Sequence, residues 1–241
     1  MSLIDAAIIG GGPAGLSAAR VATIEKKDDA HFLVFDVSGK EWHFRKILLA
    51  VGSSNIFPSI DGYEQLWGER IFHCLFCKGY EDRGAASAGV LAVSPLVISP
   101  LIIHVAMDAA QLADEVTIYT HGNEDLATQL GPIAGAKSVT VEFVDGSSKN
   151  EAFLVHSPQT TVQGPFVDQL GLSLTPMGDL QADAPMHQTS VRGVFAAGDC
   201  ITPYKVIPGA ISSGCNAAVA ASAQLHAEKY GQAAMFQLSI L

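Results

Sequence analysis

A short apolar run that leads at once into a glycine-rich turn is the feature that most constrains this fold. The segment 5–9 is largely apolar, residues 10–15 read Gly-Gly-Gly-Pro-Ala-Gly, and residues 16–20 are typical of a helix. In such a unit the first glycine permits the tight turn, the second lets the backbone approach a pyrophosphate, and the third lets the helix pack on the strand. The pattern therefore predicts a dinucleotide site at a helix N-terminus, built from Gly10, Gly12, Pro13, Ala14 and Gly15.

A second chemical signal is the pair Cys74 and Cys77. Two thiols separated by two residues can close a small disulfide, and at a helix start one of them is favoured as the reactive thiolate. Half of a tetrahedral zinc site has the same spacing, but Cys200 and Cys215 are far away in sequence and from each other. We therefore expect a redox-active disulfide and no metal site.

Composition limits the possible partners and compartment. With 241 residues, of which 49% are hydrophobic, the chain can bury the core of one large domain or two small ones. Lys and Arg number 14 against 24 Asp and Glu, with no basic cluster, so nucleic acid is not an expected partner. No secretory leader is visible and four cysteines are too few for a disulfide scaffold, which favours a reducing, cytoplasmic setting.

One segment, 89–107, approaches the length and hydropathy of a membrane span. Pro95, Pro100 and His104 interrupt it, and a short strand followed by a buried helix explains the same pattern. We expect no membrane partner.

The order of periodic segments predicts an α/β fold with two Rossmann-like three-layer (ββα) units. A hairpin over 31–35 and 42–51 is expected to return to the first sheet, and a connector over 58–68 leads into a second unit that begins at 70–73. Within that unit we expect a strand (90–93), a helix (98–115) and a strand (116–120), followed by a strand pair (138–144 with 151–155). The remaining expected segments are a return linker (164–171), a final strand that ends in a turn (191–199) and an alanine-rich helix (208–229).

The motifs, taken together, resemble a known family. The glycine turn, the CxxC pair, and the segment VFAAGDC (194–200) followed by Gly214–Ala218 resemble, in this order, the low-molecular-weight thioredoxin reductases. Residues 72–93 and 198–225 are similar to the fungal branch that includes the dithiol oxidases of disulfide-bridged secondary metabolites, the gliotoxin type. The likeness extends over nearly the whole chain.

This resemblance implies an FAD-dependent thiol-disulfide oxidoreductase. It implies an FAD domain built from residues 1–62 and 163–241, and an inserted NAD(P)-type domain, 63–162, that carries the CxxC. Cys77 would face the flavin and form the thiolate-flavin charge-transfer pair, and Cys74 would exchange with substrate. Asp199 would bond the ribityl-pyrophosphate region, although an ordinary turn aspartate is the alternative. The other residues implied to contact FAD are Gly52, Gly198, Val206 and Ile207. The family resemblance also suggests a homodimer.

The N-terminal unit departs from the family pattern because it is too short. A βαβ crossover needs a helix of about a dozen residues, and an acidic residue about 20 positions after the glycine turn should bind the adenosine ribose. Glu25 and Asp36 are the only nearby acids, and neither is well placed. We infer an internal deletion of several dozen residues between Arg20 and Val21.

Two further departures concern the inserted unit. Residues 88–96 lack a glycine fingerprint and residues 119–122 offer no arginine pair for a 2′-phosphate, which makes NADPH binding doubtful. Lys78 stands where the family places an acid or a histidine that shuttles protons, and lysine accepts protons poorly at neutral pH. His73 and Glu81 are the available substitutes. We select His73 as the candidate base, with a surface or packing role as its alternative.

The sequence thus favours oxidation of a small-molecule dithiol, with electrons passing to FAD and then to O2. One alternative is an NADPH-dependent thioredoxin reductase, with a thioredoxin-like protein as partner. The other is a non-catalytic remnant that lost FAD together with the missing segment.

Overall fold

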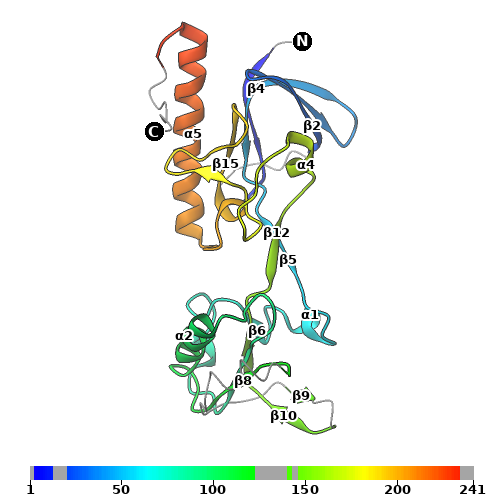
Figure 1. The fold of residues 1–241 in the computed structure, drawn as a ribbon, viewed down its shortest axis with the longest axis vertical. Coiled ribbons are helices and arrows are strands. Elements are labelled where there is room, and N and C mark those ends of the chain that lie inside the picture. Colours follow the sequence, from blue (N-terminus) through cyan, green and yellow to red (C-terminus); the bar gives the residue numbers. More distant parts are fainter. Residues whose placement is uncertain (1–2, 13–20, 123–139, 143–145, 234–241) are drawn as a thin grey trace. The chain divides into compact units, whose positions relative to one another are not determined.

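The computed structural model describes residues 3–12, 21–122, 140–142 and 146–233. The chain divides into two compact units. The first unit comprises Met1–Ser54 and Thr160–Leu241, and the second comprises Asn55–Gln159. These edges lie several residues before the domain boundaries expected at 62/63 and 162/163. Strands β5 (Ser53–Ile56) and β12 (Gln159–Val162) pair with each other where the chain leaves the first unit and returns to it (Figure 1).

The first unit is built on one mixed sheet of seven strands. Its strand order is β13-β14-β15-β4-β3-β2, and β1 also pairs with β4. The strands are β1 (Ile4–Ile9), β2 (Val21–Asp28), β3 (His31–Asp36), β4 (Glu41–Leu49), β13 (Ala182–Asp183), β14 (Gln188–Thr189) and β15 (Val194–Ala196).

Strand β4 changes partners along its length. Its first half runs antiparallel to β3, with Trp42 opposite Val34. Its second half lies parallel to both β1 and β15, with Leu48 opposite Ile8 on one side and Phe195 on the other. The hairpin expected over 31–51, with its return to the first sheet, is confirmed.

Alternating side chains divide this sheet into two buried faces. Leu48 and Ala50 lie on the face that helix α5 (Ile207–Tyr230) covers, where small residues such as Ala217 allow close packing. Ile47 and Leu49 belong to the core on the other face, which helix α4 and strands β2 and β3 help to form. The long alanine-rich helix after the Gly-Asp turn is confirmed (Figure 1).

The interpretation of 164–171 as the return linker is wrong. Residues Phe166–Leu170 form helix α4, and the return to the first unit is strand β12. Phe166 and Leu170 stand four residues apart, so both side chains enter the same core, and Gly171 ends the helix in the left-handed conformation (φ 63°).

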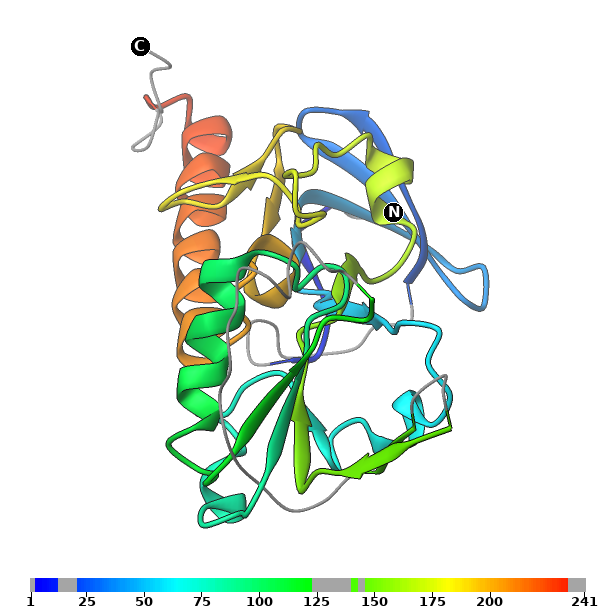
Figure 2. The same ribbon diagram turned by 60° about the horizontal axis from the view of Figure 1, so that its bottom comes forward.

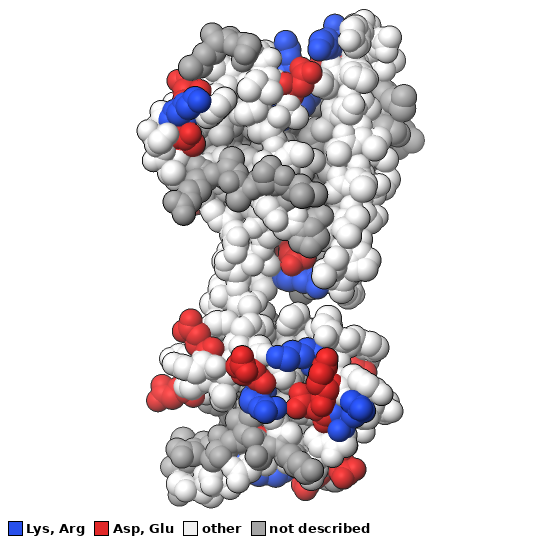
Figure 3. Space-filling view, turned by 180° about the vertical axis from the view of Figure 1, so that it is seen from behind, with Lys and Arg blue, Asp and Glu red and all other residues white. Residues whose placement is uncertain are grey.

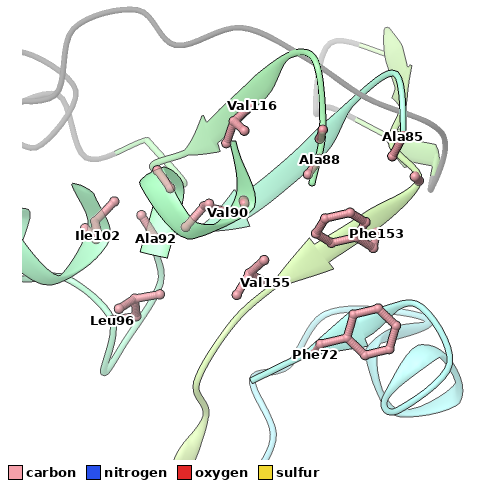
Figure 4. Packing of buried hydrophobic residues seen from close by; sticks show 14 residues of the cluster. Phe72, Ala85, Ala88, Val90, Ala92, Leu96, Ile102, Val116, Phe153 and Val155 are labelled. Atoms are coloured by element: carbon pink, nitrogen blue, oxygen red, sulfur yellow. The ribbon is translucent and has the colours of Figure 1, made fainter. Parts of the chain in front are cut away.

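The second unit has a parallel sheet in the order β6-β11-β7-β8. Its strands are β6 (Ile71–Phe72), β7 (Ala88–Leu91), β8 (Val116–Tyr119) and β11 (Phe153–Val155), and helix α2 (Ser99–Ala109) connects β7 to β8. The predicted strand, helix and strand are confirmed, and Figure 2 shows α2 beside these strands. In the core of this unit the rings of Phe72 and Phe153 pack with centroids 6.1 Å apart (Figure 4).

The predicted pairing of 138–144 with 151–155 is wrong. Strand β9 (Thr140–Glu142) pairs instead with β10 (Ser148–Asn150), and β11 lies in the parallel sheet between β6 and β7. Every residue of β11 is buried, which is typical of a central parallel strand covered on both faces. The rest of the predicted segment, 138–139 and 143–144, lies outside the described residues.

Two short helices complete the second unit. Helix α1 (Tyr63–Leu66) lies within the connector expected to be irregular, and its Tyr63 packs on the sheet face formed by Ile71, Leu91 and Leu154. The 3-10 helix η1 (Tyr80–Asp82) follows the CxxC segment.

In the described parts of the chain, no helix has the length and apolar character needed to cross a membrane. The apolar segment 89–107 contributes to β7, a loop and α2. On the face shown in Figure 3, acidic and basic side chains of the second unit are interspersed.

Candidate active site

A cavity of about 670 Å³ lies in the first unit, at the carboxyl ends of β1 and β4 and at the N-terminus of α5. All the predicted cofactor-binding residues that the structure describes line it: Gly10, Gly12, Gly52, Gly198, Asp199, Val206 and Ile207. Pro13, Ala14 and Gly15 lie outside the described residues. Segments from both ends of the chain therefore form one site.

Two glycines of the N-terminal turn have different surroundings. A Cβ on Gly10 would lie 2.0 Å from the carbonyl oxygen of Ala50, and its φ is 127°, so only glycine fits there. A Cβ on Gly12 would meet no atom within 4 Å, although Gly12 lines the cavity. The first glycine serves close packing, and the second leaves backbone open to a ligand.

The Gly198-Asp199 turn is held by two residues that the sequence analysis missed. The Ser213 hydroxyl of α5 accepts a hydrogen bond of 3.0 Å from the Gly198 amide. The Lys205 ammonium donates to the Asp199 carbonyl oxygen at 2.9 Å and pairs with the Asp179 carboxylate at 3.3 Å. In the sequence, the signal for this role was that Lys205 is a lone lysine just before an apolar helix. These contacts position the Asp199 carboxylate at the edge of the cavity.

The described lining fits a dinucleotide cofactor such as FAD. Its volume lies in the range of cofactor and drug-sized ligand sites. Glycine backbone and a helix N-terminus suit a pyrophosphate, and the Asp199 carboxylate can accept a hydrogen bond from a hydroxyl group. Asp199 is also the only acidic residue among the described lining residues.

The two acids considered for the adenosine ribose are engaged elsewhere. Glu25 forms an ion pair with Lys27 at 2.6 Å. Asp36 accepts hydrogen bonds in the β3–β4 turn, where the Ser38 hydroxyl holds the pKa of its carboxyl below the ordinary value. Neither residue lines the cavity.

The CxxC pair lies in the second unit, directly after β6. Cys74 and Cys77 form a disulfide with their Cα atoms 5.3 Å apart, and the Cys77 amide donates to the Cys74 sulfur at 3.1 Å. Cys77 is exposed, Cys74 is half-buried, and Phe76 exposes 90% of its surface. The amide contact favours negative charge on Cys74 when the bond is broken.

The expectation that the disulfide begins a helix is wrong. Residues 75–77 form a turn, closed by hydrogen bonds from the Cys77 and Lys78 amides to the Cys74 carbonyl, and the three-residue η1 begins only at Tyr80. Gly79 packs closely on this turn: a Cβ there would lie 2.4 Å from the Leu75 carbonyl oxygen.

The groups beside the disulfide are Lys78 and His73. The Lys78 ammonium donates to the Gly68 carbonyl and lies over the Phe72 ring, 5.1 Å from its centroid. His73 is exposed and stacks on Trp67. The role of His73 as a base stays a prediction.

The segment between β7 and α2, where a nucleotide-binding turn would lie, has an apolar character instead. Leu96 is buried in the core, while Val97 and Ile98 are exposed. Pro100, in the first turn of α2, has no amide hydrogen, and the Leu101 amide is already bonded to Ile98. This helix start presents few donors to a phosphate.

The other cysteines are separate from this chemistry. Cys200 is fully buried, and burial raises the pKa of its thiol to about 11, which keeps it protonated. Cys215 lies exposed on α5. No group of three or more His, Cys, Asp or Glu residues suited to a metal occurs in the described part of the chain.

No family model matches the chain. Individual relatives do. The chain is 39% identical over 238 residues to thioredoxin reductase tcpT of Claviceps purpurea, covering 90% of this chain and 74% of that protein. It is 37% identical over 222 residues to thioredoxin reductase sirT of Leptosphaeria maculans, covering 82% and 68%.

This chain belongs to the thioredoxin reductase-like family. Its members are FAD-dependent pyridine nucleotide-disulfide oxidoreductases, so the chain is an oxidoreductase of the flavoprotein class.

Solved structures agree with this assignment. An oxidoreductase from Agrobacterium tumefaciens superimposes with a TM-score of 0.72 at 28% identity, covering 90% of this chain and 75% of that one. Thioredoxin reductase from Giardia duodenalis shares the fold with a TM-score of 0.71 at 17% identity, covering 94% and 100%. The predicted α/β class of the thioredoxin reductase-like fold is confirmed.

Proposed function

We propose that this thioredoxin reductase-like protein oxidises a small-molecule dithiol to a disulfide, with O2 as the final acceptor. This proposal rests on the closed Cys74–Cys77 disulfide, which occurs in a chain that also has a glycine-lined cavity. The exposed Phe76 ring between the cysteines offers an apolar contact that suits a small organic substrate.

The protein's own sulfurs perform the exchange. A substrate thiolate attacks the Cys74 sulfur, the Cys74–Cys77 bond breaks, and Cys77 leaves as a thiolate. The second substrate thiol, once deprotonated, attacks the substrate sulfur of the mixed disulfide, so the product disulfide closes and Cys74 leaves as a thiolate. Two electrons pass from the substrate to the protein, and the two substrate protons go to His73, the protein thiolates or water. When bound in the cavity, FAD supplies the acceptor that takes these electrons and passes them to O2.

The apolar segment between β7 and α2 supports a reaction that needs no nicotinamide. Buried Leu96, exposed Ile98 and Pro100 replace the glycine backbone that a pyrophosphate requires. An NADPH-dependent thioredoxin reductase with a thioredoxin-like protein partner would run the same exchange in the opposite direction. The stopped-flow experiment below distinguishes this alternative from the dithiol oxidase.

A non-catalytic remnant is the remaining alternative. The ion pair of Glu25 with Lys27 and the bonding of Asp36 to Ser38 favour it, because neither acid considered for the adenosine ribose then lies in the described lining of the cavity. We also propose a cytoplasmic location, a homodimer and a role in secondary metabolism, the last supported by the likeness to the fungal relatives.

The deciding experiment is anaerobic stopped-flow reduction of the FAD-loaded protein by NADPH and, separately, by small dithiols. We expect rapid, saturable loss of flavin absorbance with dithiols and none with micromolar NADPH. Rapid bleaching by NADPH would favour thioredoxin reductase. A flavin that neither NADPH nor small dithiols reduce, or a protein that binds no flavin, would favour the non-catalytic remnant.

A further inference from the structure

The imidazole of His73 stacks on the indole of Trp67. Their ring centroids are 5.8 Å apart and their planes differ by 20°. His73 directly precedes Cys74, and Trp67 follows helix α1. The stack therefore connects an exposed histidine beside the disulfide to a residue on another segment of the second unit.

Trp67 itself rests on a buried aromatic group. Its indole stacks on Tyr63 with a centroid distance of 5.9 Å, and Phe57 packs on it at 5.2 Å. Tyr63 is 2% exposed, and its hydroxyl lies 2.6 Å from Nδ1 of the fully buried His156. Rings held by a hydrogen-bonded, buried pair have little freedom to move, so Trp67 offers His73 a fixed surface.

A fixed indole changes His73 in two ways. It restricts the rotamers of a side chain that would otherwise sample several, which fixes the imidazole of the residue that precedes Cys74. Tryptophan is also the ring that attracts a cation most strongly across its face, so the stack can accommodate the imidazolium that forms when His73 accepts a proton. An imidazolium next to Cys74 stabilises its thiolate.

We propose that Trp67 is a positioning residue for the exchange reaction. Through the stack it holds the His73 imidazole at Cys74, where the neutral ring accepts the proton of an incoming substrate thiol and, as the imidazolium, returns it to the departing Cys74 thiolate. His73 ends the cycle in its starting protonation state. This inference rests on the proposed function, because it takes Cys74 as the thiol that exchanges with substrate.

The first test follows the alkylation of Cys74 by iodoacetamide against pH, read by mass spectrometry of the Cys74 peptide. The reduced full-length chain carries Cys77→Ser and Cys215→Ser, so that the exposed Cys215 does not react. Trp67→Leu should move the profile to higher pH by about half a unit, which lowers the rate near neutral pH about threefold. Trp67→Phe should restore most of the loss. Phe57→Leu, which removes a neighbour but leaves the Trp67–His73 stack, should change little. An unchanged profile in folded Trp67→Leu overturns the proposal.

A second test keeps Trp67 in place, so it does not depend on whether a Trp67 variant folds. Trp67 and Trp42 are the chain's two tryptophans, so Trp42→Phe leaves Trp67 as the sole indole reporter. A stacked imidazolium quenches indole fluorescence, and the emission should therefore titrate between about pH 5 and 8, where histidine ionises. His73→Gln should abolish that titration. Emission that is independent of pH would overturn the stack and the proposal. Neither test needs FAD or turnover, so a protein that passes both but oxidises no dithiol would refute the proposed function alone.

Discussion

The Ala50 carbonyl oxygen occupies the place where a side chain on Gly10 would begin, 2.0 Å from an ideal Cβ. The amide of Ala50 also donates to the Ile9 carbonyl at 2.8 Å, which holds the two strand ends together. The first glycine of the dinucleotide turn is thus required by packing within the protein.

Gly10→Ala should destabilise the first unit. The methyl group clashes with backbone and the residue must keep a positive φ, so we expect a loss of about 2 to 4 kcal/mol in the free energy of unfolding by urea. Gly39→Ala is the matched control, because Gly39 also has positive φ (80°) but no atom within 4 Å of its Cβ. Its loss should be about 1 to 2 kcal/mol. Equal losses would show that the Ala50 contact is unimportant.

Gly12→Ala should separate binding from folding. Its Cβ meets no protein atom but projects where the cavity is open, so stability should change by no more than about 0.5 kcal/mol. FAD affinity, followed by fluorescence titration, should fall about tenfold or more, a loss of about 1.4 kcal/mol. Undiminished FAD binding would mean that the cofactor does not approach Gly12.

The chain as written should bind FAD weakly, and a family-like segment inserted between Arg20 and Val21 should restore binding. In the described residues β1 pairs with β4 alone, and Ile4 and Ile8 are 39% and 46% exposed. A restored strand and helix would cover this apolar edge and supply the ribose acid, a charge-assisted bond of about 1.5 to 3 kcal/mol. Purified protein should change from nearly colourless to yellow. Full FAD occupancy and a cooperative, high melting transition in the unrestored chain would contradict the deletion.

Much of this fold was predictable because its signals are local. The apolar run before Gly10 and the alanine-rich segment after Asp199 each specify their own element. The CxxC spacing likewise predicts a short disulfide loop.

The errors arose where distant contacts decide the structure. Residues 21–28 form β2, which the polar sequence did not indicate, because Ile24 is buried against β3 and α4. Strand β11 was misassigned because a run of three buried residues does not reveal its partners. The Trp67–His73 stack joins two nearby segments, but no motif or periodic pattern in the sequence marks it.

The buried pair of Tyr63 and His156 should make the stability of the second unit depend on pH. Burial lowers the pKa of His156 below its ordinary value of 6.5, so the unfolded chain binds the proton more tightly. Its stabilising contribution is therefore complete above pH 6.5 and is lost as pH falls toward the lowered value.

Urea unfolding at several pH values, compared between the unsubstituted chain and His156→Gln, measures this contribution. The variant should show a smaller loss of stability on acidification. Tyr63→Phe leaves buried Nδ1 of His156 without its donor and should cost about 1 to 3 kcal/mol near neutral pH. Identical pH dependence in the unsubstituted chain and His156→Gln would contradict the assignment.

The most direct test of FAD-linked dithiol chemistry is the visible absorption spectrum of the FAD-loaded protein during anaerobic titration with a small dithiol. A long-wavelength band should appear at one equivalent in the unsubstituted chain. Cys77→Ser should abolish the band, whereas Cys74→Ser should retain or strengthen it, because the Cys77 thiolate is the one expected to face the flavin. Equal bands in both variants would overturn the roles assigned to the two cysteines. A flavin spectrum that the dithiol leaves unchanged in the unsubstituted chain would contradict the proposed function itself.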